Sequence, residues 1–273
     1  MSRRVLHFGY TPDPDDAFHH WALEAGRVGV PGFDELTFVR AHVQDLNEAA
    51  IRGELDVSAI SSICYPRVSD RYVVLSTGAS VGRGYGPALA AREPLASLEG
   101  LRVAVPGSHT TGAFLLRYFH QGFTEVPMSF ERIAGAIVGG EVDAGVLIHE
   151  ELLRYAEKGL VRLECLGERW CRETELPLPV GVIVARRTLG PAVERVRRAL
   201  QESLEHAFAH RAEAMAFARR FGAHEAVDAD FVDKFANLDT LSMPEDVRSG
   251  LWELYRRAHR RHLIDREPAR EMV

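Results

Sequence analysis

Cysteine is scarce in this chain, and its pattern excludes two common structural roles. Only Cys64, Cys165 and Cys171 occur among 273 residues. Their spacing matches no metal-binding pattern, and an odd count without close pairs argues against a disulfide scaffold. The sequence therefore predicts a protein of a reducing compartment whose stability comes from its core.

Long apolar runs and basic stripes are also missing. No stretch is long enough for a signal peptide or a membrane span, which predicts a soluble, cytoplasmic protein without a membrane partner. The formal net charge is −6, and no basic stripe is interleaved with aromatic residues, so no nucleic-acid partner is expected. The glycine-rich stretch at residues 78–87 lacks the lysine of a nucleotide-binding loop and is interpreted as turns, with a binding loop as a further interpretation.

Apolar residues, by contrast, are plentiful enough for a core. Hydrophobic residues make up 46% of the chain and charged residues 26%, values that are ordinary for a soluble protein. The length predicts one large domain or two small ones.

The stretch from Arg102 to Phe119 is the first candidate for a binding corner. It begins with a buried strand at residues 101–105, turns at Pro106-Gly107, and enters an amphipathic helix near Thr111. The start of a helix presents unpaired backbone N–H groups and a partial positive charge. This helix start therefore predicts a binding site for a carboxylate or phosphate, formed by Ser108, Thr110, Thr111 and Gly112. The alternative is that the same residues are an ordinary helix cap.

An acidic corner follows the first strand, which is predicted over residues 5–10. Two prolines interrupt the chain there, and Asp15 or Asp16 is expected to cap a helix over residues 17–25. Asp13, Asp15 and Asp16 crowd one turn, with two histidines a turn later. They are either a capped helix start or polar ligands at the edge of a sheet, and on the second interpretation Asp15 binds substrate. The spacing matches no metal motif, so no metal is assigned.

Two further strand ends carry polar groups. Ser61 and Ser62 follow a short buried strand at residues 57–60 and are assigned to substrate binding. His149 follows a buried strand at residues 144–148 and is the best candidate for a general base, because an ordinary histidine has a pKa near neutrality. A histidine that is merely hydrogen-bonded in a loop is the alternative.

The order of elements predicts an α/β protein with two lobes. Residues 1–92 and 182–273 are expected to form a discontinuous first lobe with C-terminal helices, and residues 93–181 the second lobe. The corners would then face a cleft between the lobes, where such proteins bind small anionic molecules and close by a hinge. This is the architecture of type II periplasmic binding proteins.

Five runs of sequence, which together span most of the chain in one order, carry a resemblance: TPDPDDAFHHWAL, SDRYVVLSTGASVGRGYGP, LEGLRVAVPGSHTTGAFLL, GEVDAGVLIHE and LPLPVGVIVARR. They resemble the 1,4-dihydroxy-6-naphthoate synthase family of menaquinone biosynthesis and its sister, the chorismate dehydratase family. The run HTT in the first corner and IHE at residues 148–150 favour the synthase.

The resemblance implies a lyase of the futalosine pathway that splits cyclic dehypoxanthinyl futalosine to 1,4-dihydroxy-6-naphthoate without an organic cofactor. It places the catalytic base on His149 and substrate contacts on Thr110, Thr111 and Gly112 and on the loop around Ser61. The expected partner is a small-molecule substrate, and a homodimer is left open.

Two positions depart from the family pattern. The first loop of the family usually reads Ser-Pro-Cys-Pro-Asn-Asp-Thr, whereas this chain has Asp13, Asp15 and Ala17, and Ala59 stands where the family often has lysine. Added acids and a lost cation favour a less acidic or a cationic ligand, so a divergent member with another substrate stays open. The remaining alternatives are a solute-binding protein without activity and a chorismate dehydratase-like enzyme.

Overall fold

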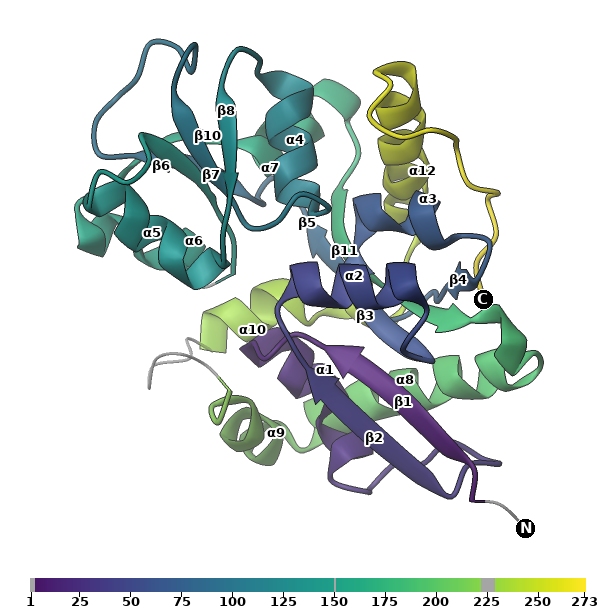
Figure 1. Ribbon diagram of the computed structural model, residues 1–273. Helices are drawn as coiled ribbons and strands as arrows, with labels where there is room; N and C mark the ends of the chain where they lie inside the picture. The colour runs from purple at the N-terminus through teal and green to yellow at the C-terminus, as the bar shows by residue number, and fades with distance from the viewer. Residues whose placement is uncertain (1–2, 150, 222–228) are drawn as a thin grey trace.

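The first lobe is built on a mixed sheet to which both halves of the chain contribute. The computed structural model describes residues 3–149, 151–221 and 229–273. The strand order is β2-β1-β3-β11-β4, with β5 paired to β11 (Figure 1). The strands are β1 (Val5–Tyr10), β2 (Glu35–Arg40), β3 (Val57–Ser61), β4 (Tyr72–Val74), β5 (Ser80–Gly82) and β11 (Leu178–Arg186).

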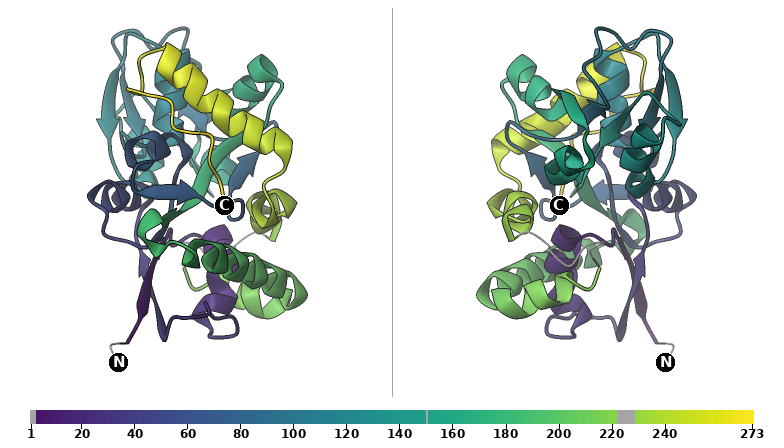
Figure 2. Two further views of the ribbon diagram at one scale, coloured as in Figure 1. Left: turned by 90° about the vertical axis from the view of Figure 1, so that its right-hand side faces the viewer. Right: turned by 90° about the vertical axis from the view of Figure 1, so that its left-hand side faces the viewer.

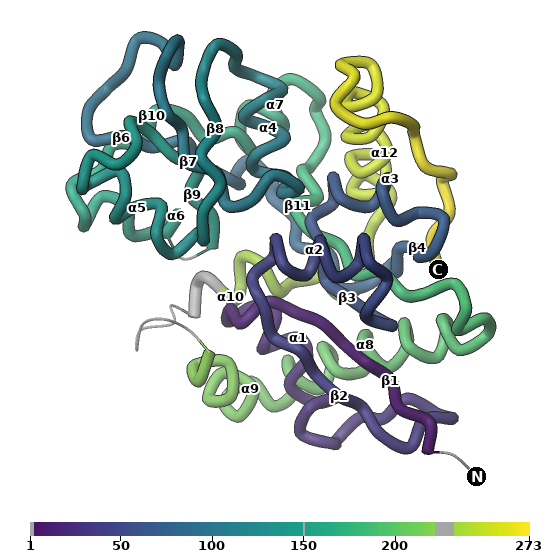
Figure 3. Tube along the Cα trace, viewed as in Figure 1, coloured from purple at the N-terminus to yellow at the C-terminus, as the bar shows by residue number. Residues whose placement is uncertain are grey.

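The strands of the second lobe follow one another in the chain, from blue through teal to green in Figure 3, between the two passages that join the lobes. Its sheet has the order β10-β6-β9-β7-β8, in which β7 runs parallel to β8 and β9. The strands are β6 (Ala88–Ala91), β7 (Arg102–Val105), β8 (Thr124–Pro127), β9 (Ala144–Leu147) and β10 (Val161–Cys165).

Helices cover both sheets, and among the described residues no helix is both long and apolar enough to cross a membrane. Those before and after the second lobe are α1 (Pro14–Glu24), α2 (Val43–Arg52), α3 (Tyr65–Val68), α8 (Ala192–Ala209), α9 (Arg211–Ala218), α10 (Ala229–Phe235), α11 (Leu238–Leu241) and α12 (Glu245–Arg260). Those within it are α4 (Thr111–Phe119), α5 (Phe130–Val138), α6 (Glu151–Arg154) and α7 (Leu166–Thr174).

The chain passes between the lobes after β5 and again before β11. The sequence-based boundary at residue 92 placed Ala88–Ala91 in the first lobe, but β6 pairs with β9 and β10 in the second sheet. The boundary at residue 181 likewise fell inside β11, which pairs along its length with β3, β4 and β5. A short apolar strand carries no mark of the sheet it will join, so pairing alone decides its lobe.

One apolar cluster runs across both lobes. It contains Ile60 and Tyr65 of the first lobe, Phe114 and Val146 of the second, and Leu251 of α12. Figure 2 shows α12 crossing the side of the molecule, and the chain then returns to β4, where the Val273 amide donates to the carbonyl of Val74 at 3.0 Å. This shared core fixes the corner at α4 relative to β3.

The start of α1 corrects an expectation. The helix begins at Pro14 and is capped by Asp13, whose side chain accepts from the Asp16 amide, rather than beginning at Ala17 behind Asp15 or Asp16. Proline at the first helical position needs no N–H partner and already has a helical φ. Two prolines in the loop therefore did not delay the helix. The glycine-rich stretch, interpreted as turns, contains the short strand β5.

Candidate active site

A cleft lies between the lobes, at the carboxyl ends of β1, β3, β7 and β9. Its empty space is about 790 Å³, its open mouth included. Apolar side chains form much of its wall, with a small number of polar groups between them, as in most small-molecule sites. The polar residues of the wall are Thr11, Asp13, Asp15, Asp16, Ser61, Ser80, Thr110, Thr111 and His149. No lysine or arginine lines it within the described ranges.

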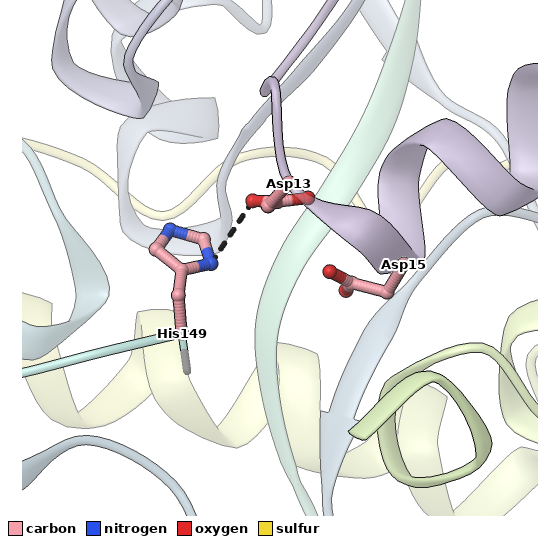
Figure 4. A group of neighbouring side chains, drawn as sticks. All are labelled: Asp13, Asp15 and His149. Carbon is pink, nitrogen blue, oxygen red and sulfur yellow. Dashed lines mark ion pairs between the residues drawn. The ribbon is translucent and has the colours of Figure 1, made fainter. Parts of the chain in front are cut away.

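The acidic corner joins the two lobes through one ion pair. His149 Nδ1 lies 2.9 Å from Asp13 Oδ2, and the Asp13 side chain is only 4% exposed (Figure 4). Asp13 comes from the start of α1 and His149 from the exit of β9, so the contact spans the cleft. His149 has a φ of 54°, a strained conformation of the kind that gathers at functional sites. Phe130 packs against its ring, with centroids 4.6 Å apart.

Thr11 ties two of the carboxyl groups together. Its hydroxyl oxygen lies 2.5 Å from Asp13 Oδ2 and 2.6 Å from Asp16 Oδ2. A hydroxyl has one hydrogen to donate, so a second short contact is satisfied only if one carboxyl group carries a proton. The two short contacts of Thr11 therefore indicate that Asp13 or Asp16 carries a proton.

The three acids have different protonation tendencies. Burial raises the pKa of Asp13, but the charge and hydrogen bond of His149 outweigh it, so this pKa lies below its ordinary value. Burial, followed by the charges of Asp13 and Asp16, holds the pKa of Asp15 well above its ordinary range. Burial and the charge of Asp13 raise the pKa of Asp16 to about 7. These directions favour the ionised form of Asp13 and the protonated form of Asp15.

The two histidines that follow the acids belong to the core of the first lobe. His19 and His20 are buried, and neither lines the cleft. Burial lowers the pKa of His19 to about 3 and that of His20 to about 4, so both are neutral. His20 stacks on Tyr10 at 4.4 Å between centroids.

The hydroxyl corner keeps its predicted place but uses its hydroxyls differently. Thr110 caps α4, accepting from the Ala113 amide at 3.3 Å, and donates its own hydrogen to Gly107 O at 2.8 Å. Thr111 donates to Val180 O at 2.6 Å, across the lobes. Both hydroxyl hydrogens are thus committed to backbone carbonyls. What remains for a ligand is the backbone N–H of Thr111 and of Gly112, which have no partner within the helix.

Close packing explains why residues 107 and 112 of this corner are glycine. Gly107 has a φ of +124°, and a Cβ there would lie 2.4 Å from the Gln44 side chain. A Cβ at Gly112 would lie 3.0 Å from Val146 and 3.4 Å from Pro87. Close packing therefore accounts for both residues, beside any approach of an anion.

The serine pair divides between the cleft and the core. Ser61, at the end of β3, lines the cleft. Ser62 is fully buried, does not line the cleft, and its hydroxyl has no hydrogen-bond partner among the described residues. Consecutive residues leaving a strand point to opposite sides, so only one of two neighbouring serines reaches the site. Glu150, the last residue of the IHE run, lies outside the described residues.

Two contributors escaped the sequence analysis. Thr11 sits between Asp13 and Asp16, and Asn47 of α2 bonds to Ser61. Asn47 could have been found, because it shares the buried face of its helix with Leu46 and Ala50. A polar residue on an apolar face needs partners nearby.

The acidic corner is also where a cation could bind. Asp13, Asp15 and His149 each offer a ligand atom, and these atoms lie within 4.8 Å of one another. Carboxylate and imidazole donors suit several divalent metals. The pairing of Asp13 with His149 offers another way to balance the charge, and no step below depends on a metal.

Comparison with known proteins identifies the relatives of this chain. Residues 6–260 match the family described as menaquinone biosynthesis. A protein of Thermus thermophilus named 1,4-dihydroxy-6-naphtoate synthase is 40% identical over 268 residues, covering 97% of each chain. A protein of the same name from Streptomyces coelicolor is 37% identical over 275 residues, covering 97% of this chain and 96% of its own.

Solved structures confirm the architecture. Protein AF1704 of Archaeoglobus fulgidus is 38% identical, with a TM-score of 0.90 over 95% of this chain and 98% of its own. The alkanesulfonate-binding protein SsuA of Xanthomonas axonopodis is 15% identical, with a TM-score of 0.71 over 100% of this chain and 99% of its own. This second likeness concerns the fold alone, which is the two-lobed, periplasmic-binding-protein-like α/β fold expected from the sequence.

Proposed function

Because the chain belongs to the menaquinone biosynthesis family, we propose that it is an enzyme of that pathway, a lyase that converts cyclic dehypoxanthinyl futalosine to 1,4-dihydroxy-6-naphthoate. The observation that carries the proposal is the ion pair between His149 and Asp13 in the wall of the cleft between the lobes. A pair of this kind is what proton abstraction beside a carbonyl group requires.

In the proposed mechanism, Asp13 sets the tautomer of His149. Asp13 is ionised, so it accepts the hydrogen of Nδ1 at 2.9 Å. The lone pair of the imidazole is then on Nε2, which takes the proton from the substrate carbon. Asp13 stabilises the imidazolium that forms, and the same proton is available for return to the leaving fragment.

The negative charge that develops on the substrate oxygen needs hydrogen-bond donors already in place. Asp15 is 7% exposed, lines the cleft, and its Oδ1 has no hydrogen-bond partner among the described residues. As a neutral carboxylic acid it offers an O–H donor. The first N–H groups of α4 are the second donor set and suit the carboxylate of the substrate.

Ala59 stands where the family often has lysine. The hydrogen-bond donors of Asp15 and of the first turn of α4 are therefore the main attraction for an anion. Ala59 lines the cleft, and a lysine at that position would have placed a cation beside the substrate. Dipoles bind a single carboxylate adequately but provide less attraction at long range than a full charge. A substrate with one carboxylate and several neutral hydroxyl groups fits this balance.

The test is incubation of the purified protein with cyclic dehypoxanthinyl futalosine, followed by mass spectrometry for 1,4-dihydroxy-6-naphthoate. We expect product from the wild type and a fall of about 10²–10⁴-fold in His149→Ala, the usual contribution of a general base. His259→Ala is the matched control, because the His259 side chain on α12 is 46% exposed and does not line the cleft. Near-full activity in His149→Ala would remove the base from this mechanism.

A second candidate is a binding protein without activity, favoured by the fold shared with SsuA. It predicts that the wild type binds the futalosine derivative, as measured by calorimetry, and yields no product after prolonged incubation. Absorbance loss with chorismate as substrate would instead favour a dehydratase. Formation of the naphthoate rejects the binding protein.

A further inference from the structure

Asn47 connects one substrate corner from each lobe. Its side chain is completely buried. Oδ1 accepts from the Ser61 amide at 2.9 Å, and Nδ2 lies 3.1 Å from Ser61 Oγ and 3.2 Å from the carbonyl of His109. Ser61 ends β3 in the first lobe, and His109 immediately precedes the cap of α4 in the second. A single amide therefore holds both sides of the cleft.

The orientation of this amide follows from its backbone partners. The Ser61 N–H can only donate, so the atom facing it must be the oxygen, and the His109 carbonyl can only accept, so the atom facing it must be the nitrogen. Nδ2 is then a donor toward Ser61 Oγ as well. Ser61 Oγ acts as an acceptor in that bond, and its own hydrogen is left to point elsewhere.

The hydroxyl hydrogen of Ser61 can point into the cleft. Ser61 lines the cleft, and no acceptor for its hydroxyl hydrogen is found among the described residues. The threonine hydroxyls across the cleft are committed to carbonyl groups. Of these three hydroxyl groups, only that of Ser61 can donate to a ligand while keeping its protein contacts.

Gln44, three residues before Asn47 on α2, also binds the turn at residues 107–110. Its Oε1 accepts from the His109 amide at 3.1 Å, so His109 is bound through both its N–H and its C=O by side chains of α2. Residues three apart share one face of a helix, which allows Gln44 and Asn47 to act on one turn. Only Asn47 also reaches Ser61, so the two residues can be separated by mutation.

We propose that Asn47 is a positioning residue that aims the Ser61 hydroxyl hydrogen at a substrate oxygen and fastens the turn at residues 107–110 to the first lobe. This inference deepens the proposed function and rests on it for the identity of the substrate. The ligand group that Ser61 would meet is an acceptor oxygen, such as a carbonyl or carboxylate.

The first test is a double-mutant cycle on KM and kcat with cyclic dehypoxanthinyl futalosine. Asn47→Asp has the same shape, but it presents an acceptor where Nδ2 was, so it draws the Ser61 hydrogen away from the ligand. We expect KM to rise about tenfold in Asn47→Asp and in Ser61→Ala, the effect of about one hydrogen bond, with kcat changed less. In the Ser61→Ala background, Asn47→Asp should raise KM by less than about threefold.

Gln44→Ala is the control, because it removes the acceptor for the His109 amide but keeps the hydrogen bonds between Asn47 and Ser61. We expect its KM to rise by less than about threefold. An equal effect of Asn47→Asp in both backgrounds would overturn the action through Ser61. If Asn47→Asp fails to fold, Ser61→Ala alone decides, and an unchanged KM there overturns the proposal.

A second measurement needs no substrate. Hydrogen–deuterium exchange of the free protein should become faster in Asn47→Asp both at Ser61 and in the turn at residues 107–110. Faster exchange on one lobe only would overturn the connection between lobes. A wild type that forms no naphthoate contradicts the proposed function but leaves this result standing.

Discussion

The acidic corner and the hydroxyl corner face each other across one cleft but meet the cost of burying polar groups in different ways. At the acidic corner, the charge of His149 lowers the pKa of Asp13, whereas burial and the neighbouring carboxylates raise the pKa of Asp15 and favour its protonated form. At the hydroxyl corner, Thr110 and Thr111 are neutral and satisfied by backbone carbonyl groups. The charges of the acidic corner therefore depend on pH, whereas the hydrogen bonds of the hydroxyl corner do not.

The difference assigns the two corners to different tasks. Proton transfer needs groups whose charge can change near neutral pH, and those gather around Asp13. Recognition of a fixed shape needs groups whose hydrogen bonds stay constant, and those gather at the start of α4. The following experiments weaken one corner at a time, from the largest expected effect to the smallest.

Asp13→Asn should have the largest effect, because the amide still accepts from His149 Nδ1 but no longer stabilises the imidazolium. We expect kcat to fall by about 10²-fold or more, with KM little changed, in steady-state assays of naphthoate formation. Asp45→Asn, an exposed residue of α2, is the control. A loss below threefold would argue that His149 does not depend on Asp13.

Asp15 separates the need for a donor from the need for a charge. Asp15→Asn keeps a neutral donor, so we expect kcat/KM within about threefold of the wild type at pH 7, whereas Asp15→Ala should lose about tenfold. The measurement is kcat/KM for both variants at the same pH. If Asp15→Asn is as poor as Asp15→Ala, ionised Asp15 is the active form and the assignment of a neutral acid is wrong.

Thr111→Val tests the hydroxyl corner with a side chain of the same shape. Loss of the bond to Val180 O should raise KM about fivefold and lower the melting temperature by about 2–4 °C. Both changes should be the same at pH 6 and pH 8, because no ionisable group takes part. A strong dependence on pH would contradict the separation of the two corners.

Asp16 gives the smallest expected effect, and the quantity measured is stability. Its pKa of about 7 in the folded protein lies above that of an unfolded aspartate, so its contribution to stability is present below about pH 4 and is lost as the pH rises through about 7. Asp16→Asn should therefore gain a few degrees in melting temperature relative to the wild type between pH 4 and pH 8.

Neutral His19 and His20 act in the opposite direction, losing stability as the pH falls from about 6.5 toward 4. Their effect is common to both proteins, so it cancels in the difference between the wild type and Asp16→Asn. A difference that does not change with pH would show that Asp16 titrates normally in the folded protein.

Local patterns predicted much of the fold. The strand at Val5–Tyr10 has the predicted bounds, and the strands at Val57–Ser61 and Arg102–Val105 each differ from the prediction by one residue at one end. Their signals lie within a few neighbouring residues. The short strand β5 and the lobe of β6 were not found, because pairing with a distant strand defines them.

By itself, the sequence determined the corners: where strands end, which polar residues follow them, and that His149 stands at the exit of a buried strand. Only the tertiary structure decided what each group does there. It paired His149 with Asp13, turned Ser62 into the core, and committed the threonine hydroxyls to carbonyl groups. The reason is that hydrogen bonds and pKa values depend on neighbours within a few ångströms, and packing of the two lobes supplies those neighbours from distant parts of the chain.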